Sequence, residues 1–400
     1  YETRTAPFIA ARLPWLLWPA YRLLRAFNIC FVVNIAAGTG HIIAEPDNFF
    51  RMRHLGEIDP GKRYVWLMSP SDRATTCVHL YRHKFWWASS SRLVYSLSLP
   101  ITMAHKDIIL DAGLSRMKWQ LTNDKRYYRL RPKETYLYSI TKSDAEGRWV
   151  EYYKRRLKTP DYFPMSEAEL ECGDLTRFLK RNTENLALIH VRLAVANATA
   201  KPTEPETYLD TLEYLADLGY QLVFIGREKM PDAFRSTGIF NYAESPVASF
   251  RNDIVLFSIA QLAITAGSGI AAMAEAFQKL PYLYLNSWHI SGPFTSRYCV
   301  CVPALAQTKQ GKFLSFREQI ELYNSLPEKQ GTQFPVGRYM ARNGTSDEIL
   351  AAAGELISLK EHYVEPSPLQ QRFSRLDDGQ LRYSQTRCSE RFLQQHSDLF

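Results

Sequence analysis

The residues best suited to bind a ligand lie where an apolar run meets a glycine turn. Residues 262–265 are rich in strand formers, Gly267-Ser268-Gly269 follows as a tight turn, and 270–277 has a helical composition. Such a turn would present backbone N–H groups at a helix N-terminus, where the helix dipole favours an anion such as a diphosphate. Glu275, one to two helical turns later, is a candidate to bind ribose hydroxyls. The alternatives are a plain strand–helix turn whose glycines only allow close packing, and a solvated helix face for Glu275.

Three more polar side chains of the second half stand at the ends of predicted strands. His190 and Arg192 alternate at the end of the apolar run 186–191, so both point to one side of a sheet, and Arg227 follows the run 221–225. A guanidinium recognises phosphate through planar, bidentate hydrogen bonds. The alternatives are a buried His190, a structural ion pair for Arg192 and a merely exposed loop position for Arg227.

The first half of the chain places a histidine and a carboxylate after its first strand. Residues 27–35 form a near-continuous apolar run, as in a buried parallel strand, and a turn with Gly38 and Gly40 follows. A turn of small residues lets another molecule approach the backbone. His41 and Glu45 are four residues apart, so they share a helical face if the helix begins early, and either is a candidate general base. The alternative is that His41 caps the turn and Glu45 is solvated.

These residues must be positioned by strands that alternate with helices. Such alternation in both halves of the 400-residue chain predicts an α/β fold with two doubly wound, Rossmann-like domains. We expect one domain at 1–165, a second at 166–335, and a C-terminal helix with a polar tail at 336–400. Residues 122–162 show no clear period and are expected to be irregular. Most of the candidates follow predicted strands, and open α/β sheets bind ligands beyond the carboxyl ends of their strands.

The composition narrows the choice of partners. The net charge is +8, with dispersed basic residues and no RNP, zinc-finger or long basic run, which disfavours nucleic acid and favours anionic substrates or an anionic membrane surface. The six cysteines form no Cys-x-x-Cys pair, which suits a reducing compartment and disfavours a zinc site. No Asp-x-Asp pair occurs. We therefore expect arginines and helix dipoles to neutralise a diphosphate without a metal, and we expect no cofactor.

The apolar and aromatic segment 6–27 contains three arginines. They interrupt it too often for a membrane-spanning helix, which needs about 20 mainly apolar residues, and no small-residue cleavage site follows a clean apolar core. Trp15 and Trp18 beside the arginines suit a membrane interface, whereas the alternative is an ordinary helix packed on the first sheet. We expect a cytoplasmic protein, with peripheral attachment to the inner membrane as a further hypothesis.

Several short motifs recur in an order that resembles a known family. They are LPWLLWP at 13–19, NIAAGTGHIIAEPDNFF at 34–50, His190-Val-Arg192, Gly226-Arg227, Asn241-Tyr-Ala243, Ala266-Gly-Ser-Gly-Ile270 and Lys312-Phe-Leu-Ser-Phe316. From about residue 14 to about residue 322 the chain is similar to bacterial glycosyltransferases of surface-glycan gene clusters. The His-x-Arg element also resembles that of GT-B fucosyltransferases, in which the arginine contacts the donor diphosphate. An acidic residue usually follows there, whereas Leu193-Ala-Val195 follow here.

The resemblance implies a GT-B glycosyltransferase that binds a nucleotide-sugar donor in its second domain. The first domain would bind a glycan, lipid-linked or protein acceptor, with His41 or Glu45 as general base. Arg192, Arg227 and the 267–269 turn would neutralise the leaving diphosphate. Two alternatives stay open. A nucleotide-sugar epimerase on the same fold needs no separate acceptor, and a non-enzymatic peripheral membrane or scaffold protein predicts no nucleotide binding.

Overall fold

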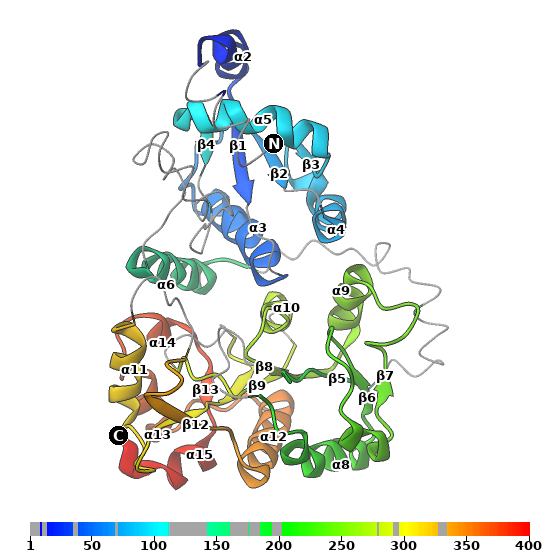
Figure 1. Cartoon of the computed structure of the whole chain (residues 1–400), viewed down its shortest axis with the longest axis vertical. Coiled ribbons are helices and arrows are strands. Elements are labelled where there is room, and N and C mark those ends of the chain that lie inside the picture. The colour runs from blue at the N-terminus through cyan, green and yellow to red at the C-terminus, as the bar shows by residue number, and fades with distance from the viewer. Residues whose placement is uncertain are drawn as a thin grey trace. The chain divides into compact units, whose positions relative to one another are not determined.

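The chain forms two compact units in the computed structural model, Tyr1–Met165 and Ser166–Phe400. Helices surround a parallel sheet in each unit (Figure 1), which confirms the predicted α/β class with two doubly wound sheets. The structure describes residues 9, 14–34, 39–68, 71–110, 112, 142–160, 175, 185–193, 202–277, 280–290, 296–326 and 334–400.

The first unit is built on a four-stranded parallel sheet in the order β3-β2-β1-β4. Its strands are β1 (Ile29–Asn34), β2 (Arg63–Met68), β3 (Trp87–Ser89) and β4 (Ile109–Leu110). The helices described in this unit are α2 (Pro14–Ala26), α3 (Thr39–His54), α4 (Asp72–Tyr81), α5 (Arg92–Ala104) and α6 (Lys142–Lys158). The chain runs outward from β1 to β3 and returns to β4 on the other side, so the strand order reverses between β1 and β4.

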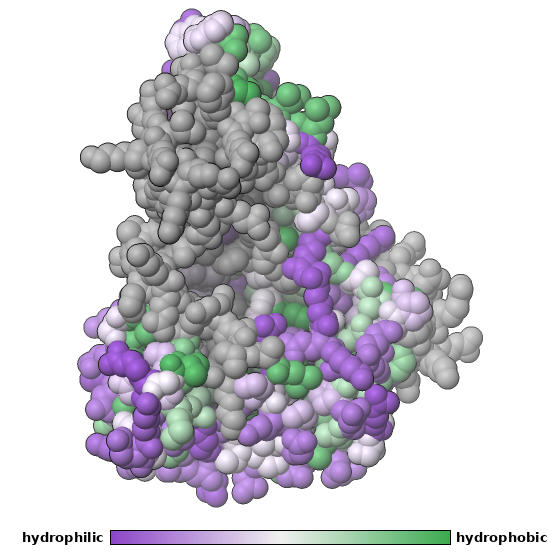
Figure 2. Space-filling view, viewed as in Figure 1, coloured by the Kyte–Doolittle hydropathy of each residue, from purple (hydrophilic) through white to green (hydrophobic). Residues whose placement is uncertain are grey.

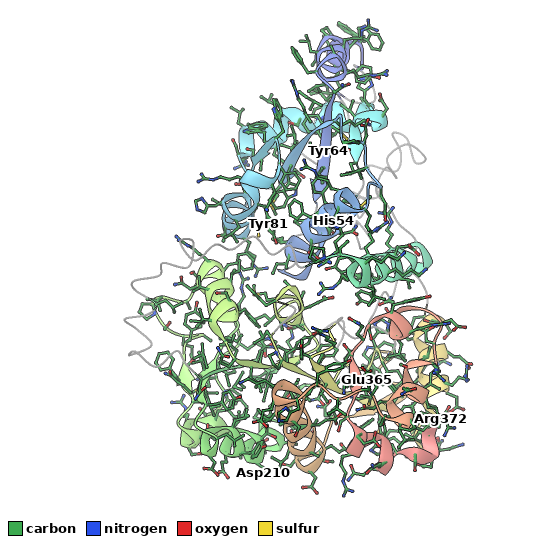
Figure 3. The ribbon with its side chains drawn as sticks, turned by 180° about the vertical axis from the view of Figure 1, so that it is seen from behind. His54, Tyr64, Tyr81, Asp210, Glu365 and Arg372 are labelled. Atoms are coloured by element: carbon green, nitrogen blue, oxygen red, sulfur yellow. The ribbon has the colours of Figure 1, made fainter. Side chains whose placement is uncertain are left out.

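Side chains along the strands alternate between the two faces of this sheet. One face packs against α2 and α5, and its core consists of Tyr21, Phe31, Val65, Leu67, Tyr95 and Ile108. The other face packs against α3 and α4 through aromatic rings. The ring centroids of Phe49 and Tyr64 are 5.2 Å apart and those of Trp66 and Tyr81 are 5.6 Å apart; Figure 3 labels the two tyrosines. Because both faces are covered, polar chemistry is confined to the strand ends.

A buried ionic network holds α6 against α3. Asp47 accepts hydrogen bonds from Arg51 Nε at 2.7 Å and Nη2 at 3.1 Å, and from the Tyr152 hydroxyl at 2.7 Å. Arg156 lies 3.5 Å from the same carboxylate and donates to the Tyr152 hydroxyl at 2.9 Å. The irregular structure predicted for 122–162 is therefore wrong where α6 lies. Its inner face is built from tyrosine and arginine rather than aliphatic residues, which hides the helical period.

The second unit contains a seven-stranded parallel sheet in the order β13-β10-β9-β8-β5-β6-β7. Its strands are β5 (Leu186–Ile189), β6 (Gln221–Phe224), β7 (Phe240–Asn241), β8 (Leu262–Ala266), β9 (Tyr282–Leu285), β10 (Cys299–Val302) and β13 (Arg387–Cys388). A separate antiparallel pair consists of β11 (Leu305–Thr308) and β12 (Tyr339–Arg342). The helices described are α8 (Leu209–Asp217), α9 (Phe250–Ile259), α10 (Ala271–Ala276), α11 (Phe316–Asn324), α12 (Ser346–Glu361), α13 (Pro368–Ser374), α14 (Gln380–Tyr383) and α15 (Glu390–Gln395).

The strand order of this sheet reverses between β5 and β8. From β5 the chain proceeds to β6 and β7 on one side, and it then crosses to β8, β9 and β10 on the other. This is the 3-2-1-4-5-6 order of dinucleotide-binding folds, in which ligands bind outside the carboxyl ends of the strands at the reversal. The candidate segments 190–192 and 267–269 follow these two strands.

Residues 336–400 fold into the second unit. The helix predicted there is present as α12, and its capping box pairs the Thr345 N–H with Glu348 Oε2 at 2.8 Å and the Glu348 N–H with Thr345 Oγ1 at 3.4 Å. The polar tail predicted after it is wrong. That segment forms α13, α14 and α15, and β13 pairs with β10 at the sheet edge. Its buried side chains include Phe373 and Phe392, but these lie too far apart among charged residues to give a periodic hydrophobic signal.

Glu348 also ties α12 to β12 and to the residues after α15. Arg342 donates to its two carboxylate oxygens at 2.9 and 3.0 Å, and His396 Nε2 lies 2.7 Å from Oε1. Burial raises the pKa of this carboxyl, but the hydrogen bonds from His396, Arg342 and the Thr345 backbone outweigh it and lower the pKa of Glu348 to about 2.

Acid should therefore remove the stability that this carboxylate provides. A carboxyl whose pKa is lower in the folded state stabilises the folded protein at pH values above its unfolded pKa, which is near 4.3. This contribution is lost as the pH falls toward 2. The shift corresponds to about 3 kcal/mol. We expect Glu348→Gln to lower the free energy of unfolding at pH 7 by about this amount and to flatten its slope between about pH 5 and about pH 2 in denaturant titrations.

Asp378→Asn is the matched control for this acid titration. Its side chain is 92% exposed and pairs with Arg382 on the surface. Exposed ion pairs contribute little, so both the stability and its pH slope should stay unchanged. Equal slopes for the wild type and Glu348→Gln would contradict the assignment.

Candidate functional site

The carboxyl ends of β5 and β8 are adjacent because the two strands are neighbours in parallel register. Ile189 pairs with Ile264, and the His190 N–H donates to Ile264 O at 2.9 Å. On its other side β5 pairs with β6, after which Gly226 and Arg227 follow. The structure therefore brings the arginine and glycine segments predicted from the second half of the sequence to one edge of one sheet.

His190 is buried beneath this edge, with 3% of its surface exposed. Its ring packs on Gly226, where φ is +115° and a Cβ atom would stand 2.8 Å from His190 Cδ2 and 3.6 Å from Ile270 Cδ1. Burial, aided by the Arg192 charge, lowers the pKa of His190 to about 3, so the ring is neutral at pH 7. Its Nδ1 atom is buried without a hydrogen-bond partner among the described residues. Of the two interpretations of His190, the structure supports the buried histidine.

Glu228 fixes the loop that follows β5. Its carboxylate accepts a hydrogen bond from the Leu193 N–H and lies 3.4 Å from Arg192 Nε. The structural ion pair weighed for Arg192 is therefore present. The Arg192 side chain is 29% exposed, and its terminal nitrogens donate no hydrogen bond to any residue that the structure describes. These nitrogens can still meet a ligand.

Sequence reasoning missed Glu228. No acidic residue closely follows Arg192 along the chain, but the neighbouring strand end supplies one. The available signal was its position two residues after Gly226, directly beyond a predicted strand. Because β5 and β6 pair in the sheet, residues 192 and 228 come together although they are far apart in sequence.

The turn Gly267–Gly269 joins β8 to a shorter helix than predicted. α10 has six residues, fewer than two turns, so the helix dipole contributes little. Ser268 also accepts hydrogen bonds from two N–H groups at the start of this helix. Its hydroxyl accepts from Ile270 N at 3.2 Å and its carbonyl from Ala271 N at 3.1 Å. An anion at this turn would therefore meet the loop backbone, where Gly269 is exposed, rather than a helix end.

The other two candidates of the second unit differ in burial. Arg227 is exposed and forms no ion pair within the described part of the chain. Glu275 is 1% exposed, so the solvated helix face considered for it is wrong. Burial raises the pKa of the Tyr284 hydroxyl, and the charge of Glu275 adds to that shift, which places this carboxylate toward the interior of the unit.

In the first unit, α3 contains both candidate bases. His41 and Glu45 lie four residues apart in this helix, which begins early enough to include Gly40 in its first turn. Glu45 is 4% exposed, which contradicts the solvated carboxylate considered for it. Gly38 lies outside the described residues. A general base on α3 stays a prediction.

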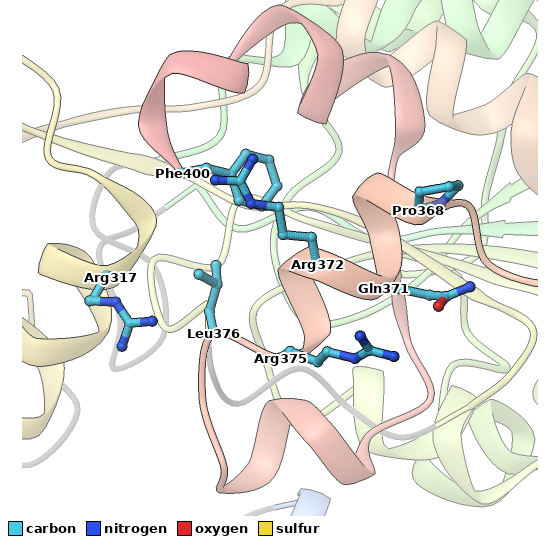
Figure 4. Close-up of a pocket in the computed structure, with 7 residues that line it drawn as sticks. All are labelled: Arg317, Pro368, Gln371, Arg372, Arg375, Leu376 and Phe400. Carbon is cyan, nitrogen blue, oxygen red and sulfur yellow. The ribbon is translucent and has the colours of Figure 1, made fainter.

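A surface pocket of about 440 Å³ lies elsewhere in the second unit (Figure 4). It is lined by Arg317, Pro368, Gln371, Arg372, Arg375, Leu376 and Phe400. These residues come from α11, α13 and the segments that follow α13 and α15, and none of them is a predicted site residue. The candidate site is therefore the sheet edge at β5 and β8, not this pocket.

No protein-family model matches the chain, and no curated protein matches its sequence. Among similar solved structures is a glycosyl transferase family 9 protein from Veillonella parvula, with 10% identity over 83% of this chain and 97% of that chain and a TM-score of 0.48. Another is heptosyltransferase WaaC of E. coli with ADP, with 14% identity over 68% of this chain and 90% of that chain and a TM-score of 0.36. At these identities and TM-scores the likenesses carry no argument about the reaction.

Gly226→Ala should destabilise the second unit more than a glycine replacement without a close neighbour. Alanine would combine backbone strain at φ +115° with a 2.8 Å contact on His190. We expect a loss of about 2–4 kcal/mol in the free energy of unfolding, measured by denaturant titration. The control is Gly219→Ala, where φ is +81° and nothing lies within 4 Å of the added atom, so about 1 kcal/mol should be lost. Equal losses would mean that the His190 ring does not constrain the edge.

Proposed function

We propose that the protein transfers a sugar from a nucleotide-sugar donor to an acceptor, and that the second unit binds the donor. The observation that carries this proposal is the strand reversal between β5 and β8, with Arg192 after one strand and an exposed glycine turn after the other. Doubly wound sheets bind nucleotides at such reversals. Two such units in one chain are the composition of GT-B enzymes, and the motif order shared with surface-glycan glycosyltransferases supports the same class.

The donor diphosphate would lie over the edge formed by these strands. Arg192 would use its terminal nitrogens for a bidentate contact, Arg227 would add a second positive charge, and the backbone at Gly269 would approach the phosphate closely. As the bond from the anomeric carbon to the diphosphate oxygen breaks, negative charge grows on the leaving group. Preorganised cations that meet this charge lower the barrier.

The acceptor would bind to the first unit, and it would be a glycan, a lipid-linked sugar or a protein. His41 or Glu45 on α3 would take the proton from the acceptor hydroxyl while its oxygen forms the new bond to the anomeric carbon. The products are the glycosylated acceptor and a nucleoside diphosphate.

The first experiment is a thermal-shift screen of the full chain against UDP, GDP, ADP, CMP and dTDP. A stabilising nucleotide then selects the nucleotide sugars for incubation with and without acceptor extracts. Acceptor-dependent release of nucleoside diphosphate supports transfer, and an altered sugar without this release supports an epimerase instead. Absence of nucleotide binding would contradict both enzymes. The same assay in EDTA, followed by Mg²⁺ or Mn²⁺, tests the expected independence from metal.

Arg192→Ala should weaken nucleotide binding. A charge-assisted hydrogen bond contributes roughly 1.5–3 kcal/mol, so we expect the dissociation constant to rise about ten- to a hundredfold by calorimetry. Stability should fall by less than about 1 kcal/mol, because the ion pair with Glu228 is partly exposed. Arg235→Ala is the control, since that exposed arginine pairs with Asp232 on the surface.

Glu228→Gln separates the two roles of Arg192. Glutamine can still accept the Leu193 N–H but no longer competes with an anion for the guanidinium. If Arg192 binds phosphate, this variant should keep or raise nucleotide affinity, opposite to Arg192→Ala. If the ion pair is purely structural, both variants should change stability alike and leave nucleotide affinity unchanged.

Gly269→Val should impair nucleotide binding rather than folding. Gly269 is exposed, so a larger side chain there displaces no buried residue. The branched side chain of valine would nevertheless crowd the backbone where phosphate approaches. We expect at least about a tenfold loss of nucleotide affinity and a change in Tm below about 2 °C. Gly354→Val, inside α12 with nothing within 4 Å of an added Cβ, is the control. Normal affinity in the folded Gly269 variant would remove this turn from the site.

A further inference from the structure

Most of the exposed large hydrophobic side chains gather in the early part of the first unit. Nine of the fifteen among the described residues lie between positions 15 and 97. They are Trp15, Leu16, Trp18, Leu23, Phe27, Trp86, Trp87, Leu93 and Leu97, which we call the amino-edge surface. Figure 2 shows hydrophobic side chains over α2 and α5. Each of the four tryptophans is at least 44% exposed.

The amino ends of the parallel strands bring part of this surface together. Phe27 precedes β1, Trp86 precedes β3, and Arg63 begins β2 between them. The Arg63 N–H donates to Asn28 O at 2.8 Å, and its guanidinium lies 5.6 Å from the centre of the Trp86 ring. α2 precedes β1 at this edge and packs against α5, which contains Leu93 and Leu97.

α2 is apolar on two sides. Tyr21 and Leu24 pack toward the sheet, whereas Trp15, Trp18 and Leu23 are 52–66% exposed. An apolar face is stable when another surface covers it, and the described part of the unit covers only the side of α2 that carries Tyr21 and Leu24. Monomeric proteins rarely leave a large apolar patch in water unless it binds something.

Charge and residue type favour an anionic lipid surface as the occupant. The exposed Arg22 lies over the Trp18 ring at 5.6 Å from its centre, as Arg63 lies over Trp86. Tryptophan rings prefer the headgroup level of a bilayer, and neighbouring arginines meet lipid phosphates. None of the described helices is long and apolar enough to cross a bilayer. We propose that the amino-edge surface docks on an anionic membrane, with α2 lying in the plane of the interface.

The test is flotation of the full chain with vesicles of phosphatidylglycerol in phosphatidylcholine, compared with phosphatidylcholine alone. The double variant Trp15→Ser/Trp18→Ser should lose at least about tenfold in partitioning, because each ring buries apolar area in the interface. Its Tm should fall by less than about 3 °C, since Trp15 is 66% exposed and Trp18, whose ring packs on Tyr21, is 52% exposed. The matched control is Leu218→Ser/Val364→Ser, which removes side chains that are 45% and 61% exposed on the second unit.

Arg22→Gln tests the electrostatic part of the docking. It should weaken binding to the anionic vesicles about fivefold, and added salt should also weaken this binding. The proposal is overturned if the wild type does not float with anionic vesicles, or if the double tryptophan variant floats equally well. It is also overturned if the wild type self-associates without binding vesicles and the tryptophan variant stays monomeric, because a second copy would then be the occupant. None of these outcomes depends on the proposed sugar transfer.

Discussion

A parallel sheet covered on both faces leaves only its strand ends for chemistry, and this constraint governs both units. In the second unit, every residue of β5, β8, β9 and β10 is buried. Polar groups that must meet a ligand can therefore stand only beyond these strands. The order of the sheet selects the place, because the reversal between β5 and β8 separates the connections that would otherwise cover the strand ends. Gly226 then makes room for the His190 ring beneath the edge, which leaves the space above it to Arg192 and the glycine turn.

The ion pair between Arg192 and Glu228 is compatible with ligand binding. The pair is partly exposed, and Arg192 Nε lies 3.4 Å from the Glu228 carboxylate, so the pair contributes little to stability. A diphosphate carries more charge than a carboxylate and can engage two nitrogens at once. Glu228 also accepts the Leu193 N–H, so it holds the loop in place whether or not Arg192 turns to a ligand. A residue that orients the arginine and then yields it to the stronger anion would preorganise the site.

Local signals in the sequence predicted the fold where they act alone. The apolar runs 27–35, 186–191 and 262–265 each depend only on neighbouring residues, and the structure contains a strand in each of them, β1, β5 and β8. α6 escaped prediction because its inner face is tyrosine and arginine.

The candidate site was less predictable than the fold. The side chains that follow β5, β6 and β8 were found because strand ends are visible in the sequence. Glu228 was missed because its position beside Arg192 results from the pairing of β5 with β6, which no local sequence pattern encodes. The hydrogen bonds of Ser268 were not predicted either, because a helical composition does not reveal that this residue accepts the N–H groups of Ile270 and Ala271.

The first sheet has chemically different ends, and this difference relates the two proposals. Its amino edge is lined by exposed aromatic residues such as Phe27 and Trp86, whereas α3, with Glu45 buried, begins beyond the carboxyl end of β1. β1 has six residues, which at the rise of a parallel strand separates the two edges by about 20 Å. Because α3 connects two parallel strands, it runs back along the sheet, and Glu45, six residues into the helix, lies about 9 Å closer to the amino edge than the start of α3 does. A membrane docked at the amino edge would then lie on the order of 10 Å from a base at Glu45. The two proposals together therefore favour an acceptor hydroxyl that stands above the headgroups, as in a lipid-linked sugar, over one within the headgroup layer.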